Sequence, residues 1–338
     1  MKLRGAISGF GEVAAKAHLA GWRTRENVSI GVIHDPVSER RHEAIRLIKN
    51  VRVYDDLELM LDGEALDFVD IASPPALHAE AARAALNAGA HVLVEKPLCL
   101  SLAEFDELAA LAAAHERVLM CVHNWKYAPS YALARKLLDE GRIGDVLSVS
   151  FERLRVAPAG AGGAGGAWRA SSESGGGILI DHGWHVFYLM QWLMGGEAAS
   201  RIAATMTINP GGVEEVAELD VSFASGRRAS AMLSWRAKER RTSARLTGTA
   251  GRLEIENERV ILAAADGVHE LPVSDIADDS YHSAWFSGMA ALFEAAMREG
   301  AAGSIASSNS IEARSALAII TAARTSAKNH GAPTDIAS

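Results

Sequence analysis

The chain has 338 residues, of which 49% are hydrophobic and 22% charged, and its formal net charge is −8. This length can form two domains or one large domain, and the composition excludes a largely disordered chain. The negative charge argues against nucleic-acid binding, and no apolar run is long enough to span a bilayer. The first residues lead directly into a glycine motif and leave no room for a signal peptide, so we expect a cytoplasmic protein without nucleic-acid or membrane partners.

Apolar, strand-like runs alternate with helical patterns through the first third of the chain. This repeated order predicts an α/β domain, in which a parallel sheet is covered by helices on both faces. The expected strands are residues 3–8, 28–34, 51–54, 68–72, 91–94 and 118–122, and the expected helical segments are 13–20, 39–48, 57–61, 76–88 and 102–114.

The segment between the first strand and the first helix has the pattern of a dinucleotide-binding loop. Gly9 permits a tight turn, Gly11 lets a pyrophosphate approach the backbone, and Ala14 still allows close helix packing. A tight turn without a ligand has the same pattern, but the surrounding strand and helix favour a cofactor whose phosphates face the helix terminus. The expected cofactor contacts here are Gly9, Phe10, Gly11, Glu12 and Val13.

Asp35 ends the second expected strand and bears on the choice of cofactor. A carboxylate there can bond the adenosine ribose hydroxyls and repel a 2′-phosphate, which favours NAD. Arg40 and Arg41 follow shortly; they can instead accept a phosphate, or lie in the solvated first turn of a helix. We therefore expect NAD, with NADP as the alternative, and place Asp35 and Arg40 among the cofactor contacts.

The fourth expected strand ends in Ser73, Pro74 and Pro75. Ligands of such sheets bind beyond the carboxyl ends of the strands, so Pro74 and Pro75 are expected to line the nicotinamide side of the crevice. Ser73 and Pro74 are placed among the cofactor contacts. The same residues suit a rigid turn in which proline starts the next helix. His78 is expected either to touch the cofactor or to cap that helix.

Glu95, Lys96 and Pro97 bring two charges to the end of the apolar strand 91–94. A desolvated lysine there can donate to a substrate hydroxyl and help to steer its proton, and Pro97 permits a cis peptide bond. The alternative is a Glu–Lys pair on an exposed turn. We place Glu95 and Lys96 at the cofactor.

Three glycines at 175–177 lead into a segment with Asp181 and His185. These residues are four apart in the expected helix 178–193, so their side chains project from the same face. The glycines let a ligand or another backbone come close.

The remaining pattern predicts an antiparallel sheet with helices. Tight turns such as 224–226 separate some of the strands, and the polar last residues are expected to fray. The further helices are 131–140, 284–299 and 311–327, and the strands are 145–155, 202–208, 217–224, 229–235, 243–248, 252–255, 260–264 and 269–273.

With these motifs, the chain resembles the glucose-fructose oxidoreductase / inositol dehydrogenase / MocA (Gfo/Idh/MocA) family over almost its whole length. The run 88–98 and the glycine–Asp–His segment 175–185 are the specific parts of the resemblance. It also includes residues 9–14, 72–78, 141–144 and 168–169.

The resemblance implies an N-terminal Rossmann NAD(P)-binding domain and a C-terminal α+β domain with a large open, mainly antiparallel sheet. We place these at residues 1–123 and 124–330, the second serving substrate binding and oligomerisation. A homodimer or homotetramer is implied, and Met232, Leu233 and Trp235 suggest that it buries the uncovered sheet face.

Family members mostly oxidise or reduce a secondary alcohol on a sugar or cyclitol. By position, Lys96, Asp181 and His185 surround the reacting carbon. His185 is suited to take the hydroxyl proton as a hydride moves to nicotinamide, and Lys96 to hold the reacting oxygen. Asp181 would orient the substrate or tune the histidine. Taken alone, His185 also suits a satisfied core histidine.

Two positions depart from the family pattern and leave the substrate open. Tyr188 stands where an acidic residue often follows the histidine, and Lys126 stands where the family often has arginine. The almost pure Ala/Gly stretch 157–167 is expected to form a mobile loop over the site. Further substrate contacts are expected at Asn124, Lys126, Trp168, Arg169, Tyr281 and His282. Trp168 and Tyr281 suit a packing role equally well.

Some features and functions lie outside this scheme. Cys99 and Cys121 are read as small core residues, the basic cluster 236–241 as a solvated strand end, and no residue set has metal-ligand spacing. Redox-assisted glycoside hydrolysis with tightly held NAD is an alternative activity. A cofactor-sensing regulator is a second alternative, and it would be expected to lack the three catalytic residues.

Overall fold

The computed structural model describes residues 2–160, 168–256, 259–273 and 281–337. The chain forms two compact units, one of residues 1–127 with 278–314 and one of residues 128–277 with 315–338. The first unit thus includes a segment, residues 278–314, that lies between two parts of the second unit in the sequence.

Sheet A of the first unit has six strands in the order β3-β2-β1-β4-β5-β6, and all its pairs are parallel. This is the order of a dinucleotide-binding fold and confirms the predicted α/β domain. The strands are β1 (Leu3–Ser8), β2 (Val28–His34), β3 (Arg52–Tyr54), β4 (Phe68–Ile71), β5 (His91–Val94) and β6 (Leu119–Cys121).

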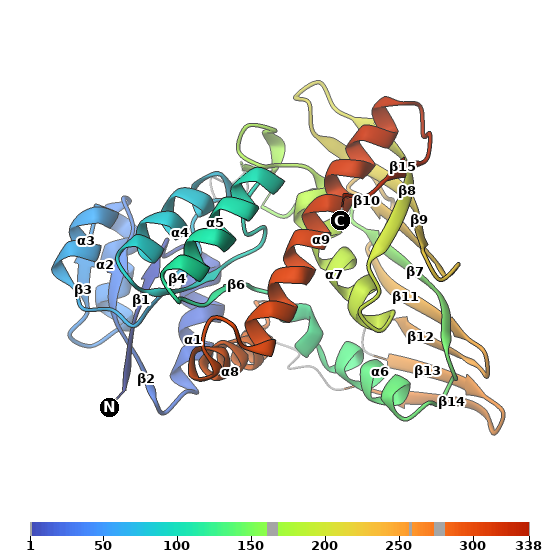
Figure 1. The fold of residues 1–338 in the computed structure, drawn as a ribbon, viewed down its shortest axis with the longest axis horizontal. Helices are drawn as coiled ribbons and strands as arrows, with labels where there is room; N and C mark the ends of the chain where they lie inside the picture. Colours follow the sequence, from blue (N-terminus) through green and yellow to red (C-terminus); the bar gives the residue numbers. More distant parts are fainter. Residues whose placement is uncertain (1, 161–167, 257–258, 274–280, 338) are drawn as a thin grey trace. The chain divides into compact units, whose positions relative to one another are not determined.

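Helices follow the strands of sheet A, as the alternating pattern predicts (Figure 1). The first begins with a π-helical segment, and α5 begins at a capping box of Ser101 and Glu104. The helical segments are η1 (Ala14–His18), α1 (Leu19–Arg23), α2 (Ser38–Leu47), α3 (Leu57–Gly63), η2 (Pro75–Leu77), α4 (His78–Asn87), α5 (Leu102–Ala114) and η3 (Asn124–Tyr127).

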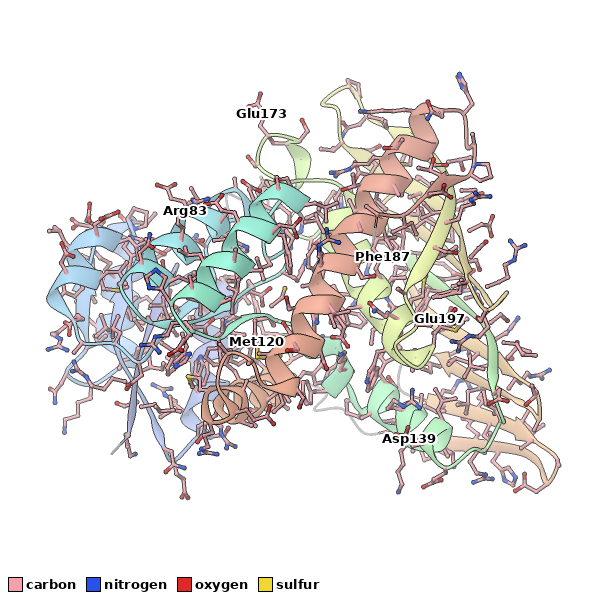
Figure 2. The ribbon with its side chains drawn as sticks, viewed as in Figure 1. Arg83, Met120, Asp139, Glu173, Phe187 and Glu197 are labelled. Carbon is pink, nitrogen blue, oxygen red and sulfur yellow. The ribbon has the colours of Figure 1, made fainter. Side chains whose placement is uncertain are left out.

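Helix α8 (Ser283–Glu299) joins the core of the first unit although it lies far along the chain. Its Phe286 and Phe293 pack on Trp22, with ring centroids 5.8 and 6.3 Å away. The buried Glu294 carboxylate accepts from Arg25 at 2.8 Å. Met120 of β6, labelled in Figure 2, belongs to the same core.

Sheet B of the second unit has nine strands in the order β14-β13-β12-β11-β7-β10-β9-β8-β15. Only the β7–β10 pair is parallel among the described strands, which confirms a large, mainly antiparallel sheet. The strands are β7 (Val146–Leu154), β8 (Ala199–Ile208), β9 (Glu214–Phe223), β10 (Arg228–Ser234), β11 (Arg241–Gly248), β12 (Arg252–Glu256), β13 (Arg259–Ala264), β14 (Gly267–Pro272) and β15 (Thr334–Asp335).

One face of sheet B is covered by helices. Figure 1 shows α6 (Pro129–Asp139), α7 (Trp184–Leu193) and the end of α9 (Ser304–Lys328) on that face, and no helix of the described chain on the other. Helix α7 is buried along almost its whole length, and its Phe187, labelled in Figure 2, is 1% exposed. Alternation along the central strands, such as β9, β10 and β11, therefore separates an apolar covered face from a polar open face.

The prediction that Met232, Leu233 and Trp235 lie together on the open face of sheet B is wrong. Leu233 and Trp235 are buried, and Leu233 packs beside Gly183 under the covering helices. Met232 does line the open face, but among charged side chains such as Glu218 and Arg245. Period-two alternation separates Leu233 from Met232, so the three residues form no common apolar patch.

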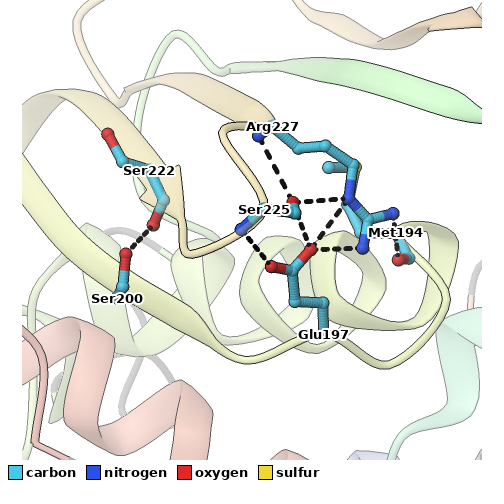
Figure 3. Close-up of polar contacts among 6 residues, drawn as sticks. All are labelled: Met194, Glu197, Ser200, Ser222, Ser225 and Arg227. Atoms are coloured by element: carbon cyan, nitrogen blue, oxygen red, sulfur yellow. Dashed lines mark hydrogen bonds and ion pairs between the residues drawn. The ribbon is translucent and has the colours of Figure 1, made fainter.

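Glu197, just after α7, ties the β9–β10 turn to the helix end (Figure 3). Its carboxylate accepts from the Ser225 N–H at 2.9 Å and from Arg227 Nε at 2.8 Å, while Arg227 also donates to the Met194 carbonyl at 2.8 Å. These bonds hold the β9–β10 hairpin at the C-terminal end of α7.

The expectation that the polar C-terminal residues fray is wrong for Thr334–Asp335. This short strand, β15, pairs with β8, and Asp335 accepts from Arg201 at 2.8 Å. Backbone pairing to an open sheet edge needs no apolar side chain, so hydropathy did not indicate it. No described helix is both long enough and apolar enough to cross a membrane.

Candidate active site

A cavity of about 350 Å³ opens in the first unit where β1, β2 and β4 end. Gly9 lines it with φ +88°, and a Cβ there would lie 2.5 Å from the Ser73 backbone nitrogen. Only glycine fits this position, because both the conformation and the neighbouring chain exclude a side chain. The buried Ser73 hydroxyl has no hydrogen-bond partner among the described residues. The cradle and the orphan hydroxyl fit a bound dinucleotide.

The Asp35 carboxylate lies at the wall of this cavity. It accepts from the Phe10 N–H at 2.7 Å and from the Val37 N–H at 2.9 Å, and it is 4% exposed. Each carboxylate oxygen still has a lone pair for a ribose hydroxyl. The Phe10 ring itself is buried in the core, so its backbone is the part that faces the loop.

Arg40 and Arg41 point to different partners. The Arg40 guanidinium lies against the glycine loop, where a Cβ on Gly11 would meet it at 2.4 Å. Arg41 donates to the Asp35 carbonyl at 2.7 Å and lies 3.7 Å from Asp55. Of these two arginines, Arg40 is the one at the glycine loop, and its contact with a phosphate stays a prediction.

Tyr281, a predicted substrate contact, lies at the start of the first helix. Its hydroxyl bonds Glu12, and Lys16 donates to it at 3.2 Å. Val13, another predicted cofactor contact, is 45% exposed. Glu12, Lys16 and Tyr281 thus form one hydrogen-bonded group at the start of this helix.

His78 ties the ends of β4 and β5 together. Its Nδ1 lies 2.6 Å from the Pro97 carbonyl and its Nε2 lies 2.7 Å from the Ser73 carbonyl. It makes no side-chain cap on α4, so that alternative is wrong. Burial lowers the pKa of His78, and the neutral ring donates to one carbonyl at a time. The peptide bond between Lys96 and Pro97 is cis.

A buried ionic network lies beside Lys96. His18 reaches Asp70 at 2.9 Å through Nδ1 and Glu95 at 3.0 Å through Nε2, and its ring stacks on Phe286 at 3.9 Å. Glu95 in turn accepts from the Lys96 N–H at 2.9 Å. Burial opposes the charge on His18, but both carboxylates outweigh burial and raise the pKa of His18 to about 10. Likewise, burial opposes ionisation of Glu95, but His18 and Lys96 hold its pKa below the usual range.

Asp181 of the second unit lies on a π-helical segment, η5 (Leu179–Gly183), directly before α7. Its carboxylate is 3.1 Å from Arg169 Nε and 3.6 Å from His182 Nε2, and it is 4% exposed. The Arg169 guanidinium also lies over the Trp168 ring at 4.5 Å. The predicted Asp181, Trp168 and Arg169 therefore come together.

The glycines before Asp181 explain how Arg169 is placed. A Cβ on Gly176 would lie 2.5 Å from the Arg169 carbonyl oxygen, and the Gly177 N–H donates to the same oxygen at 3.1 Å. Of the two expected uses of these glycines, close approach of another backbone is what the structure shows. That approach holds Arg169 against Asp181.

His185 lies one turn further on, within α7. Its Nδ1 is 3.0 Å from the Tyr188 hydroxyl, and both side chains are buried. The residue that departs from the family pattern is therefore in contact with the predicted catalytic histidine.

The remaining predicted substrate contacts belong to the first unit. The Lys126 ammonium contacts Glu312, and the Asn124 Oδ1 atom is buried without a hydrogen-bond partner among the described residues. His282 has φ +55° and stacks on Trp285 at 3.7 Å. Their role in substrate binding stays a prediction.

Several residues of these networks were not predicted from the sequence. Asp70 carried a signal, because it is a charged residue in the otherwise apolar strand Phe68–Ile71. His18 and Glu312 had none, since a histidine or a glutamate on a helix is ordinary in a sequence. Most of the predicted loop at 157–167 lies outside the described residues. In the part of the chain that the structure describes, no cluster of His, Cys, Asp and Glu can hold a metal.

Comparison with known proteins gives a family match in each of two parts of the chain. Residues 3–123 match the model "Oxidoreductase family, NAD-binding Rossmann fold", and residues 131–254 match "GFO/IDH/MocA C-terminal domain". A solved levoglucosan dehydrogenase, in complex with NADH and levoglucosan, has the same fold, with a TM-score of 0.86, 23% identity and 100% of each chain covered.

Two curated relatives are sugar dehydrogenases. D-apiose dehydrogenase of Paraburkholderia graminis is 30% identical over 67% of this chain and 58% of its own length. D-glucoside 3-dehydrogenase of Escherichia coli is 29% identical over 60% of this chain and 57% of its own length. The matched part thus spans less than two thirds of either relative. Both domain models match, so the chain belongs to the Gfo/Idh/MocA family of oxidoreductases, with an NAD-binding Rossmann fold at its N-terminal side.

Proposed function

We propose that this chain is a dehydrogenase that moves a hydride between a nicotinamide cofactor and a secondary alcohol or ketone. The substrate is a sugar, a sugar derivative or a cyclitol. The observation that carries the proposal is the placement of Lys96. This residue follows the carboxyl end of β5, and the carboxyl ends of β1, β2 and β4 in the same sheet form the dinucleotide cavity. NAD is the preferred cofactor, because Asp35 lines that cavity.

Bound nicotinamide supplies the hydride acceptor or donor. In this proposal the Lys96 ammonium donates a hydrogen bond to the reacting oxygen and stabilises its alkoxide character. His185 accepts the hydroxyl proton during oxidation and returns it during reduction. Asp181, paired with Arg169, orients the substrate. The names of the sugar dehydrogenases among the relatives support this class of substrate.

The test is reduced-nicotinamide absorbance with purified protein, NAD or NADP, and a panel of cyclitols, aldoses and sugar acids. We expect one class of compound to reduce NAD, and NADP to react more slowly. Release of sugar from a glycoside without net NADH would instead indicate redox-assisted hydrolysis. Cofactor binding without turnover of any compound or glycoside would contradict the proposal and favour a regulator.

A further inference from the structure

Arg155 is a buried cation that the proposed mechanism does not use. It follows β7 directly and is 9% exposed. Its guanidinium donates to the carbonyls of Leu154 at 2.8 Å and Arg241 at 3.0 Å and to the Thr242 hydroxyl at 3.0 Å. These acceptors are all neutral, whereas buried charges in proteins are normally paired with an opposite charge.

The charges around Arg155 do not balance it. Burial, and then repulsion from Arg240 and Arg153, lowers the pKa of Arg155 to about 10, and Asp181 is the acidic group that opposes this. Asp181 is already within 3.1 Å of Arg169. The charged groups that act on Arg155 are therefore mainly cationic. An anion bound there would relieve the repulsion.

Trp235 adds an independent sign of a missing acceptor. Its indole Nε1 is buried and has no hydrogen-bond partner among the described residues. Leu154 pairs with Ser234, so Arg155 and Trp235 are the next residues of two neighbouring parallel strands. Two buried donors therefore project from adjacent positions of the covered face.

We propose that Arg155 and Trp235 bind an oxyanion group of the substrate, so that the enzyme acts on an anionic sugar derivative rather than a neutral sugar. This rests on the dehydrogenase function proposed above. The guanidinium offers a planar pair of donors that matches a carboxylate or a phosphate, and the indole offers one more. The basic residues at 236–241, read from the sequence as a solvated strand end, include Arg240, which adds its charge to the same site.

The test compares sugar acids, sugar phosphates and neutral sugars as ligands and as substrates. Melting temperature with NAD present reports binding without turnover, because a ligand of the native state stabilises it. The panel contains D-gluconate, D-glucuronate, D-glucose 6-phosphate, D-glucose and myo-inositol. We expect an anionic compound to bind and react at least tenfold better than its neutral counterpart. Comparison of the sugar acids with the sugar phosphate identifies which oxyanion the site binds.

Variants locate the effect. Arg155→Gln should raise KM or Kd for the anionic compound by about 10- to 100-fold, with little change for a neutral one, and Arg155→Lys should recover part of the loss. Arg240→Gln, at an exposed residue, should weaken anion binding several-fold even if Arg155→Gln fails to fold. Arg245→Gln is the matched control, since it removes the same charge from the open face of the sheet.

The outcomes separate the two proposals. If neutral sugars reduce NAD as well as anionic ones, or if Arg155→Gln and Arg240→Gln leave their ratio unchanged, the anion site is overturned while the dehydrogenase function stands. If no compound reduces NAD but an anion raises the melting temperature in an Arg155-dependent way, the anion site stands and the dehydrogenase function falls.

Discussion

His185 and Tyr188 form a hydrogen-bonded pair inside α7, with 3.0 Å between Nδ1 and the phenol oxygen and an angle of 77° between the rings. The family often has an acidic residue at the position of Tyr188. A phenol can orient the imidazole as a carboxylate does, but it adds no negative charge beside it. The pair therefore bears directly on the pH at which His185 can act as a base.

The variant Tyr188→Glu should move the acid limb of the activity profile to higher pH by about one unit, because a carboxylate stabilises the protonated imidazole. Tyr188→Phe should lower kcat by about tenfold through loss of orientation, with little effect on the pH dependence. The measurement is kcat against pH for both variants. Identical profiles for the wild type and Tyr188→Glu would mean that His185 is not the titrating base.

Gly9→Ala should abolish cofactor binding. The alanine Cβ would collide with the Ser73 backbone at 2.5 Å in addition to the strain of φ +88°. Gly89→Ala is the matched control, because Gly89 has φ +80° with no heavy atom within 4 Å of the added Cβ. The control should cost about 1–2 kcal/mol of stability and leave NAD affinity unchanged. Equal NAD affinity in both variants, measured by titration, would remove the glycine loop from the cofactor site.

Arg40→Gln should reduce affinity for NADP about tenfold and affinity for NAD less, since the guanidinium at the glycine loop is placed for a phosphate. Asp35→Asn should narrow the preference for NAD, because the charge that repels a 2′-phosphate is lost. Arg41→Gln serves as the control, as Arg41 bonds the Asp35 carbonyl. The measurement is the dissociation constant of each variant for both cofactors. A larger loss of NADP affinity in Arg41→Gln than in Arg40→Gln would mean that Arg41, and not Arg40, contacts the phosphate.

Stability should depend on His18 in a defined pH range. The pKa of His18 is raised to about 10 in the folded protein, from about 6.5 in the unfolded chain. The protonated ring therefore contributes stability that is fully present below pH 6.5 and is lost as pH rises through 10. The melting temperature of the wild type should exceed that of His18→Gln by a margin that shrinks across this range. A margin independent of pH would mean that His18 is neutral when folded.

Local pattern predicted most of the fold because most strands of sheet A are largely apolar runs bounded by turns. The π-helical segments at Ala14–His18 and Leu179–Gly183 were not predicted, since hydrophobic spacing does not distinguish one wide turn within a helix. Strand β15 was missed because its partner, β8, lies more than a hundred residues away. Long-range backbone pairing leaves no mark in local hydropathy.

The candidate site was predictable only where chemistry follows a motif. Gly9, Asp35 and Lys96 carry recognisable spacing, and the structure places all three at the strand ends of one unit. The ionic network beside Lys96 could not be predicted, because His18 and Glu95 are in contact but lie 77 residues apart in the sequence. Arg155 was equally hidden, since an arginine after a strand reads as solvated until its burial is known.

The measurement that tests the central claim most directly is NAD reduction by two single variants, Lys96→Ala and His185→Gln, with the best compound of the panel. NAD affinity is titrated in parallel. The account predicts that kcat falls by about 100-fold or more in Lys96→Ala and His185→Gln, while both still bind NAD. It is contradicted if either variant keeps wild-type kcat, because the hydride transfer would then proceed without the residue assigned to its proton or its oxygen.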